Sequence, residues 1–175
     1  MEAVADNSSP NKTLHDHPIT IRPMRNEDNE AVLQIYTKDI ETKNATFEAQ
    51  TPTWEVWDAN HISHSRFVAT FNGIVVGWSA LTPYSRRAVY QGVHELSIYI
   101  NPDYAGKGIG SKLMNTIVKS ARDNGSWMLQ ASIFPENQAS ISLHKKFGFR
   151  EVGYRERIAQ LDGVWRDVIL LEKRF

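Results

Sequence analysis

The sequence predicts an α/β domain built on a mixed, mostly antiparallel sheet, and two observations lead to this fold class. Extended apolar runs flank the turn pairs Asn72-Gly73 and Asp162-Gly163, a pattern typical of antiparallel hairpins. Between these hairpins, the extended run ending at Ile100 and the run 127–133 flank a segment whose apolar residues recur every four positions. A strand, a helix and a strand in that order indicate a crossover connection.

The elements of the first half follow from local patterns. A short edge strand is expected at 19–23, then a helix over about 27–41 with its apolar residues near one face, and a second helix after Thr51-Pro52 that carries Trp54, Trp57 and Ile62. Strands are expected at 66–71 and 74–81, joined by a type I′ turn that needs positive φ at Asn72 and Gly73. A further extended run covers about 89–100.

The second half alternates helices and strands. A helix that begins near Ile109 and ends near Asn124-Gly125 presents Ile109, Leu113, Ile117 and Ala121 as one stripe. The strand 127–133, a short helix over 138–147 and two strands around Asp162-Gly163 complete the chain. The expected total is six to seven strands and about four helices. Residues 1–18 are polar and lack a period, so they are expected to form a flexible tail before a single domain over 19–175.

Composition narrows the possible functions. Lys plus Arg equals Asp plus Glu, 20 against 20, which gives no electrostatic reason to expect nucleic acid or a membrane surface as partner and favours a small neutral or zwitterionic ligand. The absence of cysteine excludes disulfides, thiolate metal ligands and a cysteine nucleophile, and no metal site is predicted. A signal peptide and an apolar run of 18 residues are both lacking, so a cytoplasmic location is expected.

The segment Y-A-G-K-G-I-G-S-K-L-M, Tyr104–Met114, places a glycine cluster at the start of the predicted helix. Free backbone N–H groups at a helix N-terminus favour phosphate binding. The spacing does not supply the G-x-x-x-x-G-K-[ST] of a Walker loop or the G-x-G-x-x-G of a dinucleotide-binding fingerprint. A purely structural turn remains the alternative to an anion site.

Several motifs, in order, resemble the Gcn5-related N-acetyltransferase family. They are V-V-G-W (75–78), E-L-S-I-Y-I-N-P (95–102), G-K-G-I-G-S (106–111), N-Q-A-S (137–140) and L-H-K-K-F-G-F (143–149). The resemblance runs from about Ile19 to Phe175 and implies the fold of that family, a mixed, mostly antiparallel sheet with flanking helices. It also implies acetyl-CoA as co-substrate.

The resemblance assigns the cofactor-binding residues. Backbone amides of the loop would hold the pyrophosphate, the strand 98–100 would pair with the pantetheine arm, and Asn137 would flank the rest of the cofactor, although it could equally be a helix N-cap. The implied set is Ile98, Tyr99, Ile100, Gly106, Lys107, Gly108, Ile109, Gly110, Ser111 and Asn137. The family often has Arg or Gln just before these glycines, where this sequence has Ala105, a departure expected to reduce affinity without removing binding.

Within the family, the sequence is similar to the phosphinothricin and methionine sulfoximine acetyltransferases, through I-Y-T-K-D-I-E-T-K-N-A-T-F-E and H-E-L-S-I-Y-I. This similarity implies a small, amino-acid-like acceptor and a homodimer. The implied acceptor-binding residues are Phe47, Glu48, Ser85, Arg86, Arg87, Tyr90, Glu95, Leu96 and Ser97. The two arginines could instead be solvated loop residues, and Tyr90 could instead pack in the core.

Two residues are predicted to handle protons. An α-ammonium must lose a proton before it attacks a thioester, and a half-buried Glu95 can accept that proton. The alternative is an ordinary solvent-facing strand glutamate. His144 stands where many relatives carry a tyrosine that protonates the CoA thiolate, and an imidazole can also donate a proton, although a lone helix histidine is more often structural.

The predicted function is acetyl transfer from acetyl-CoA to the α-amine of a phosphinothricin or methionine sulfoximine type of compound. Without cysteine an acetyl-cysteine intermediate cannot form, which favours direct transfer, with the oxyanion held by a backbone N–H of 98–100. Two alternatives remain at this point: a non-catalytic acetyl-CoA sensor, and an acetyltransferase for a protein N-terminus, a polyamine or another small amine.

Overall fold

The structure, a computed structural model, describes residues 18–175, so nearly all of the predicted tail lies outside the described residues. A seven-stranded sheet has the order β1-β2-β3-β4-β5-β7-β6. Its strands are β1 (Thr20–Pro23), β2 (Phe67–Phe71), β3 (Ile74–Pro83), β4 (Val93–Ile100), β5 (Met128–Ile133), β6 (Arg150–Leu161) and β7 (Val164–Arg174). The helices are α1 (Asn29–Glu41), α2 (Trp54–Asn60), α3 (Ile109–Asp123) and α4 (Gln138–Lys146).

This element order confirms the predicted fold class, with two local corrections. The extended run expected from 89 begins later, because residues 88–90 form a short 3₁₀ turn and β4 starts at Val93. A Cβ on Gly92 would lie 2.1 Å from the Trp127 ring, so only glycine fits where the chain passes that side chain into β4. Ile62 lies beyond the end of α2 and packs against the central core instead.

The hairpin turns have the geometry that the sequence predicts. Asn72 and Gly73 adopt φ values of 51° and 78°, as a type I′ turn requires, and β2 pairs antiparallel with β3 around them. Asp162 and Gly163 repeat this conformation at the tip of the β6–β7 hairpin, with φ values of 50° and 79°. Two short turns therefore set the strand pairing next to them, and the register of each hairpin shifts further along, between Ala69 and Thr70 in one and at two places in β6 in the other.

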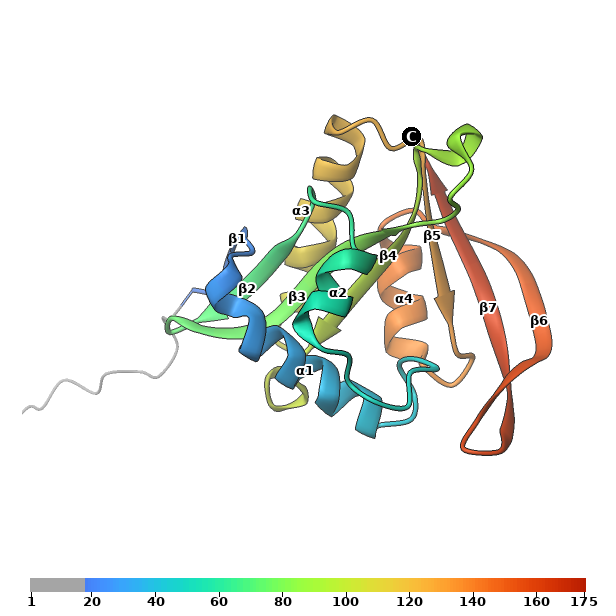
Figure 1. Ribbon diagram of the computed structural model, residues 1–175, viewed down its shortest axis with the longest axis horizontal. Helices are drawn as coiled ribbons and strands as arrows, with labels where there is room; N and C mark the ends of the chain where they lie inside the picture. Colours follow the sequence, from blue (N-terminus) through green and yellow to red (C-terminus); the bar gives the residue numbers. More distant parts are fainter. Residues whose placement is uncertain (1–17) are drawn as a thin grey trace, which may run out of the picture.

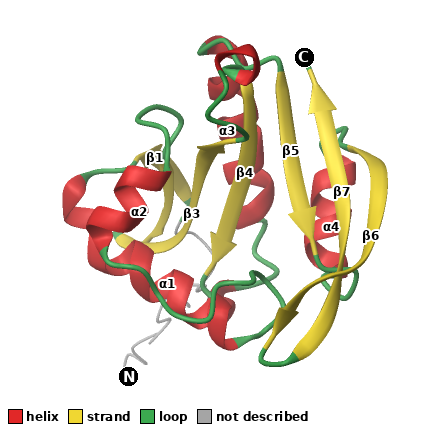
Figure 2. Cartoon of the chain, turned by 45° about the vertical axis from the view of Figure 1, so that its right-hand side comes forward, coloured by secondary structure: helices red, strands yellow, loops and turns green. Residues whose placement is uncertain are grey.

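The crossover in the middle creates a gap in the sheet. β4 pairs with β3 along its whole length, from Pro83↔His94 to Gly77↔Ile100. It pairs with β5 in parallel only over its first three residues, Val93 to Glu95. Beyond Glu95 the two strands separate, as Figure 2 shows, and residues 96–100 have no strand partner on that side.

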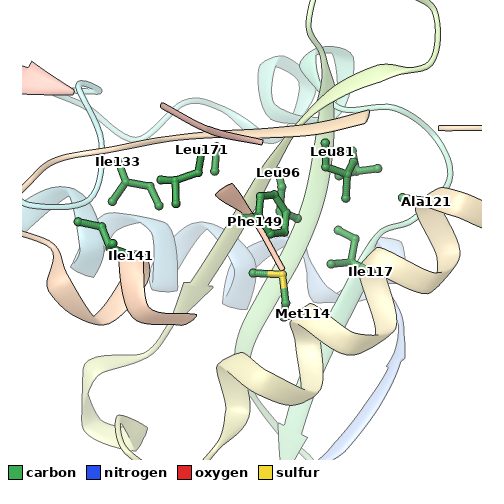
Figure 3. Packing of buried hydrophobic residues seen from close by; sticks show 11 residues of the cluster. Leu81, Leu96, Met114, Ile117, Ala121, Ile133, Ile141, Phe149 and Leu171 are labelled. Carbon is green, nitrogen blue, oxygen red and sulfur yellow. The ribbon is translucent and has the colours of Figure 1, made fainter. Parts of the chain in front are cut away.

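Helices cover both faces of the sheet. α1 and α2 lie over β2, β3 and β4 on one face, and α3 and α4 lie on the other (Figure 1). The stripe predicted on α3 is buried, and Figure 3 shows Met114 and Ile117 of this helix facing Leu81 and Leu96 of the sheet. Within residues 18–175, no helix combines the length and the apolar character needed to cross a membrane.

Candidate active site

A cavity of about 1080 Å³ lies where β4 and β5 separate. Its walls come from α1 and the loop after it, from β4 and β5, and from α4. Both predicted proton-handling residues line it, Glu95 from β4 and His144 from α4. The cavity therefore brings together two residues that lie far apart in the sequence.

Glu95 is the last residue of β4 that pairs with β5, opposite Gln130. Its side chain is half-buried, and Nε2 of Gln130 lies 3.5 Å from its Oε2 atom. Burial raises the pKa of the Glu95 carboxyl, and the opposing effects of hydrogen bonds from Ser132 and Gln130 and of the Arg155 charge are smaller. The result is a carboxyl at the edge of the gap that holds its proton more tightly than an exposed glutamate does.

Beyond Glu95, β4 presents to the cavity a backbone edge that pairs with no strand of the described residues. The Asn101 N–H donates to the carbonyl of Val76 on β3 at 2.9 Å. Because N–H groups alternate in direction along a strand, those of Ile98 and Ile100 point away from β3, toward the open side. Ile98, Tyr99 and Ile100 all line the cavity, so this edge can pair with an extended ligand.

The glycine loop leads into α3. Gly106 and Gly108 have φ values of 76° and 75°, which favour glycine, and a Cβ on either would meet nothing within 4 Å. Gly108 is the N-cap of α3 and supplies no side-chain cap, so the first N–H groups of this fifteen-residue helix have no capping side chain. Such a terminus favours an anion, and Lys107 stands beside it.

Gly110 has a different role from the two glycines before it. It lies within the first turn of α3, and a Cβ there would stand 3.0 Å from Cδ2 of Leu143 and 3.1 Å from Cδ1 of Ile100. Close packing between α3, β4 and α4 is therefore enough to explain this glycine. Ser111 lies next to Lys146, whose Nζ is 3.3 Å from its Oγ atom.

His144 is buried, with only 4% of its surface exposed. Its Nδ1 atom lies 2.8 Å from the carbonyl oxygen of Ser140, an acceptor that fixes the proton on Nδ1. Nε2 is buried and has no partner among the described residues. Burial lowers the pKa of the imidazole, which favours the neutral ring, whose Nε2 accepts rather than donates a hydrogen bond.

The residues predicted to bind the acceptor divide into two groups. Six others line the cavity together with Glu95: Phe47, Glu48, Ser85, Arg86, Leu96 and Ser97. Arg87 and Tyr90 do not line it; the Arg87 guanidinium lies 5.8 Å from the Tyr90 ring centroid in the loop before β4. The structure therefore brings one of the two neighbouring arginines into the cavity wall.

The loop between α1 and α2 is held to the start of α4 and to β7 by two hydrogen bonds to its backbone carbonyls. Asn137 is the N-cap of α4, one of the two roles expected from the sequence, with its Oδ1 accepting from the Ser140 amide at 3.1 Å. Its Nδ2 donates to the carbonyl of Asn44 at 3.1 Å. Arg166 on β7 donates to the carbonyl of Lys43 at 2.7 Å. These contacts join residues about 93 and 123 positions apart, so no local sequence pattern indicates them.

Comparison with known proteins decides the family. The model of the Acetyltransferase (GNAT) family matches residues 29–149, which include β4, the glycine loop, α3 and most of the cavity wall. The chain belongs to the GNAT acetyltransferase family. This GNAT protein is therefore an N-acetyltransferase, as the resemblance predicted.

Individual relatives cover nearly all of the GNAT chain. One relative is YwnH of Bacillus subtilis (strain 168), whose name describes it as a phosphinothricin acetyltransferase. The two sequences are 34% identical over 158 residues, which cover 87% of this chain and 97% of YwnH. The phosphinothricin N-acetyltransferase of Alcaligenes faecalis is 30% identical and covers 88% and 81%. A crystal structure of a phosphinothricin acetyltransferase from Sinorhizobium meliloti in complex with AcCoA is 25% identical, with a TM-score of 0.82 and coverage of 90% and 88%.

Proposed function

We propose that this protein transfers an acetyl group from acetyl-CoA to the α-amine of a small amino acid analogue of the phosphinothricin or methionine sulfoximine type. The observation that carries the proposal is the position of Glu95, a half-buried carboxyl with a raised pKa at the point where β4 and β5 separate. The names of the relatives support this acceptor class.

The residues that the cavity and the loop present fit acetyl-CoA, which supplies an activated thioester. Uncapped N–H groups at the start of α3 and the glycines at positive φ suit a pyrophosphate. The open edge of β4 at Ile98 and Ile100 suits an extended amide-containing arm. Asn137 lines the cavity from the N-terminus of α4 and stands where it can flank the cofactor.

Glu95 acts as the general base in this proposal. It accepts the proton of the acceptor ammonium, and the free amine then attacks the thioester carbonyl directly, because the sequence has no cysteine to carry an acetyl group. The Ile98 N–H, on the open edge, stabilises the oxyanion of the tetrahedral intermediate.

His144 is assigned a smaller role than the sequence suggests. A neutral ring with its proton on Nδ1, held by the Ser140 carbonyl, must first gain a proton on Nε2 before it can protonate a thiolate. Because burial disfavours the charged ring, we propose that the proton which the attacking nitrogen loses in forming the amide passes to the departing CoA sulfur, and that His144 mainly accepts a hydrogen bond from the resulting thiol.

Acceptor recognition is assigned to side chains that line the cavity from β4, from the loop before it and from the loop after α1. Arg86 offers a guanidinium fork to the carboxylate of an amino acid, and Phe47 and Ser97 define the space around it. We choose Arg86 over Arg87 because only the former lines the cavity.

We also propose a homodimer that uses the β6–β7 hairpin. β6 is an edge strand of 12 residues, and the hairpin exposes Tyr154 and Trp165 to 55% and 48%. Exposed aromatic side chains beside an unpaired strand edge are typical of an interface. The cytoplasmic location stays a prediction from sequence.

An acceptor screen tests the proposed function. The protein is incubated with acetyl-CoA and single amines, including phosphinothricin, methionine sulfoximine, methionine sulfone, polyamines and short peptides, and thiol release is followed. Turnover with the amino acid analogues is expected. Binding of acetyl-CoA without turnover on any amine would favour a sensor, and turnover on peptides or polyamines alone would contradict the acceptor class.

A further inference from the structure

Asp39 is a second buried carboxyl on the cavity wall, and the reaction proposed above does not use it. It lies in the last turn of α1, where the negative end of the helix dipole disfavours a further negative charge. Its Oδ2 atom is buried and has no partner among the described residues. The nearby lysines are engaged elsewhere, Lys38 with Asp103 at 2.7 Å and Lys43 with Asp162 at 3.0 Å.

The backbone amide of Ile100 lies close enough to the Asp39 carboxyl to lower its pKa, and it is the one effect that opposes burial there. This amide belongs to the open edge of β4, the edge that faces away from β3. Asp39 therefore lies beside one of the backbone N–H groups that an extended ligand would need in order to pair with β4. A ligand on this edge would remove the donor that stabilises the carboxylate.

The side chains around Asp39 cannot replace that donor with a positive charge. Tyr36 of α1 and Tyr99 of β4 line the same cavity, with their ring centroids 4.9 Å apart. The pKa of each hydroxyl lies above its usual value, chiefly because of burial, and the charge of Asp39 adds to the rise for Tyr99. Glu48, Glu95 and Arg86 line the same cavity, and among the described residues no salt bridge joins Asp39 to a positively charged side chain. Burial raises the pKa of Asp39 to about 7, against the smaller lowering effect of the Ile100 amide.

We infer that Asp39 takes up one proton from solvent when acetyl-CoA binds along β4, and that cofactor affinity therefore falls at alkaline pH. The inference rests on the proposed function, because it needs the pantetheine arm to pair with Ile100. Once a ligand carbonyl accepts from the Ile100 N–H, the carboxylate has lost its donor and faces a polyanionic cofactor. Its neutral form can remain in the wall and can donate its O–H to the ligand.

Isothermal titration calorimetry measures this proton directly. The wild type is titrated with acetyl-CoA at about pH 8, in two buffers that differ in ionisation enthalpy, and the binding constant is followed from about pH 6 to pH 9. The dissociation constant is expected to rise about tenfold per pH unit above the titration of Asp39. Asp39→Asn is expected to bind as tightly as wild type near pH 6 and about tenfold more tightly near pH 8.

Two comparisons keep the outcome specific to Asp39. The phosphates of the cofactor titrate equally in both proteins, so the difference in proton uptake between wild type and Asp39→Asn isolates the carboxyl. Glu41→Gln, an exposed carboxyl two residues further along the same helix, is expected to behave as wild type. Circular dichroism checks that both variants fold.

The possible results separate this inference from the proposed function. Proton uptake near one equivalent in the wild type and near zero in Asp39→Asn supports the inference. Binding with equal uptake in both proteins overturns it and leaves the proposed function intact. If acetyl-CoA binds at no pH tested, both the proposed function and this inference are contradicted.

Discussion

Glu95 lines the cavity from β4 and His144 lines it from α4, and burial acts on both side chains in the same physical way. It disfavours the charged form of each side chain, so the pKa of the carboxyl rises and the pKa of the imidazole falls. The chemical consequences differ. A carboxylate with a raised pKa is a stronger base, whereas an imidazole with a lowered pKa is less often protonated and is a poorer source of protons near neutral pH.

The neighbours of the two residues extend this difference. Glu95 has Gln130 and Ser132 beside it, which can hold its anion once the proton has left. His144 has the carbonyl and the hydroxyl of Ser140 beside Nδ1, and its Nε2 has no partner within residues 18–175. The surroundings of Glu95 therefore allow its carboxyl to change charge, whereas the surroundings of His144 favour a neutral imidazole.

The largest expected effect is that of Glu95→Gln, which keeps the shape of the side chain and removes the base. We expect kcat near neutral pH to fall by roughly 10²-fold or more, with little change in acetyl-CoA affinity. Steady-state kinetics and calorimetric binding give the two quantities. Glu156→Gln, an exposed carboxyl on β6, serves as the control and should leave kcat unchanged. A drop in acetyl-CoA affinity as large as the drop in kcat would contradict the assignment.

Gly110 of α3 packs against Ile100 of β4 and Leu143 of α4, so a larger residue at this position should push the two elements apart. Gly110→Ala is expected to lower the free energy of unfolding by about 1–3 kcal/mol through overpacking. Chemical denaturation measures this change. Gly153→Ala is the control, because a Cβ there meets nothing within 4 Å and φ is not positive. Equal stability of the two variants would show that the walls are not packed through Gly110.

The opposite directions of the two pKa shifts predict opposite pH dependences of stability. A raised Glu95 pKa means that the folded state binds more protons than the unfolded state, so the wild type loses stability as pH rises above about 4.3. A lowered His144 pKa means the reverse, with stability lost as pH falls below about 6.5.

Urea denaturation at several pH values measures both effects. Relative to wild type, Glu95→Gln should gain stability as pH rises, and His144→Phe should gain stability as pH falls. Each slope is limited to about 1.4 kcal/mol per pH unit for one proton. Slopes of the same sign in the two variants would show that burial does not control both groups.

The smallest expected effect on catalysis is that of His144→Phe. Phenylalanine preserves the edge-to-face packing on Phe149, whose ring centroid lies 5.0 Å from that of His144. We expect kcat to stay within about threefold of wild type, because a neutral ring contributes little as an acid. A loss near that of Glu95→Gln, in a folded variant, would make His144 the proton donor and would end the contrast between the walls.

Much of the fold could be predicted because its signals are local. The Asn72-Gly73 turn, the stripe on α3 and the glycine loop are each specified by neighbouring residues. The predicted extended run starts at residue 89, four residues before β4 does. The start of β4 depends on the packing of Gly92 against Trp127, a contact between residues that are distant in the sequence. Hydrophobic periodicity does not contain that information.

The site was predicted less completely for the same reason. Glu95 and the glycine loop belong to sequence motifs. No motif marks Asp39, whose raised pKa depends on its burial and on the nearby Ile100 amide in the folded chain. Arg166 donates a hydrogen bond to the carbonyl of Lys43, 123 positions away in the sequence. The residues next to Arg166 in the sequence do not predict this contact. Burial, which decides the protonation of both Glu95 and His144, is a property of the assembled walls.

The pH dependence of kcat tests the central claim most directly. With the acceptor identified by the screen, the wild type is expected to show kcat rising with pH to a plateau, with an apparent pKa above that of an ordinary glutamate, and Glu95→Gln is expected to lose this rise. An identical profile in the wild type and in Glu95→Gln would contradict the account.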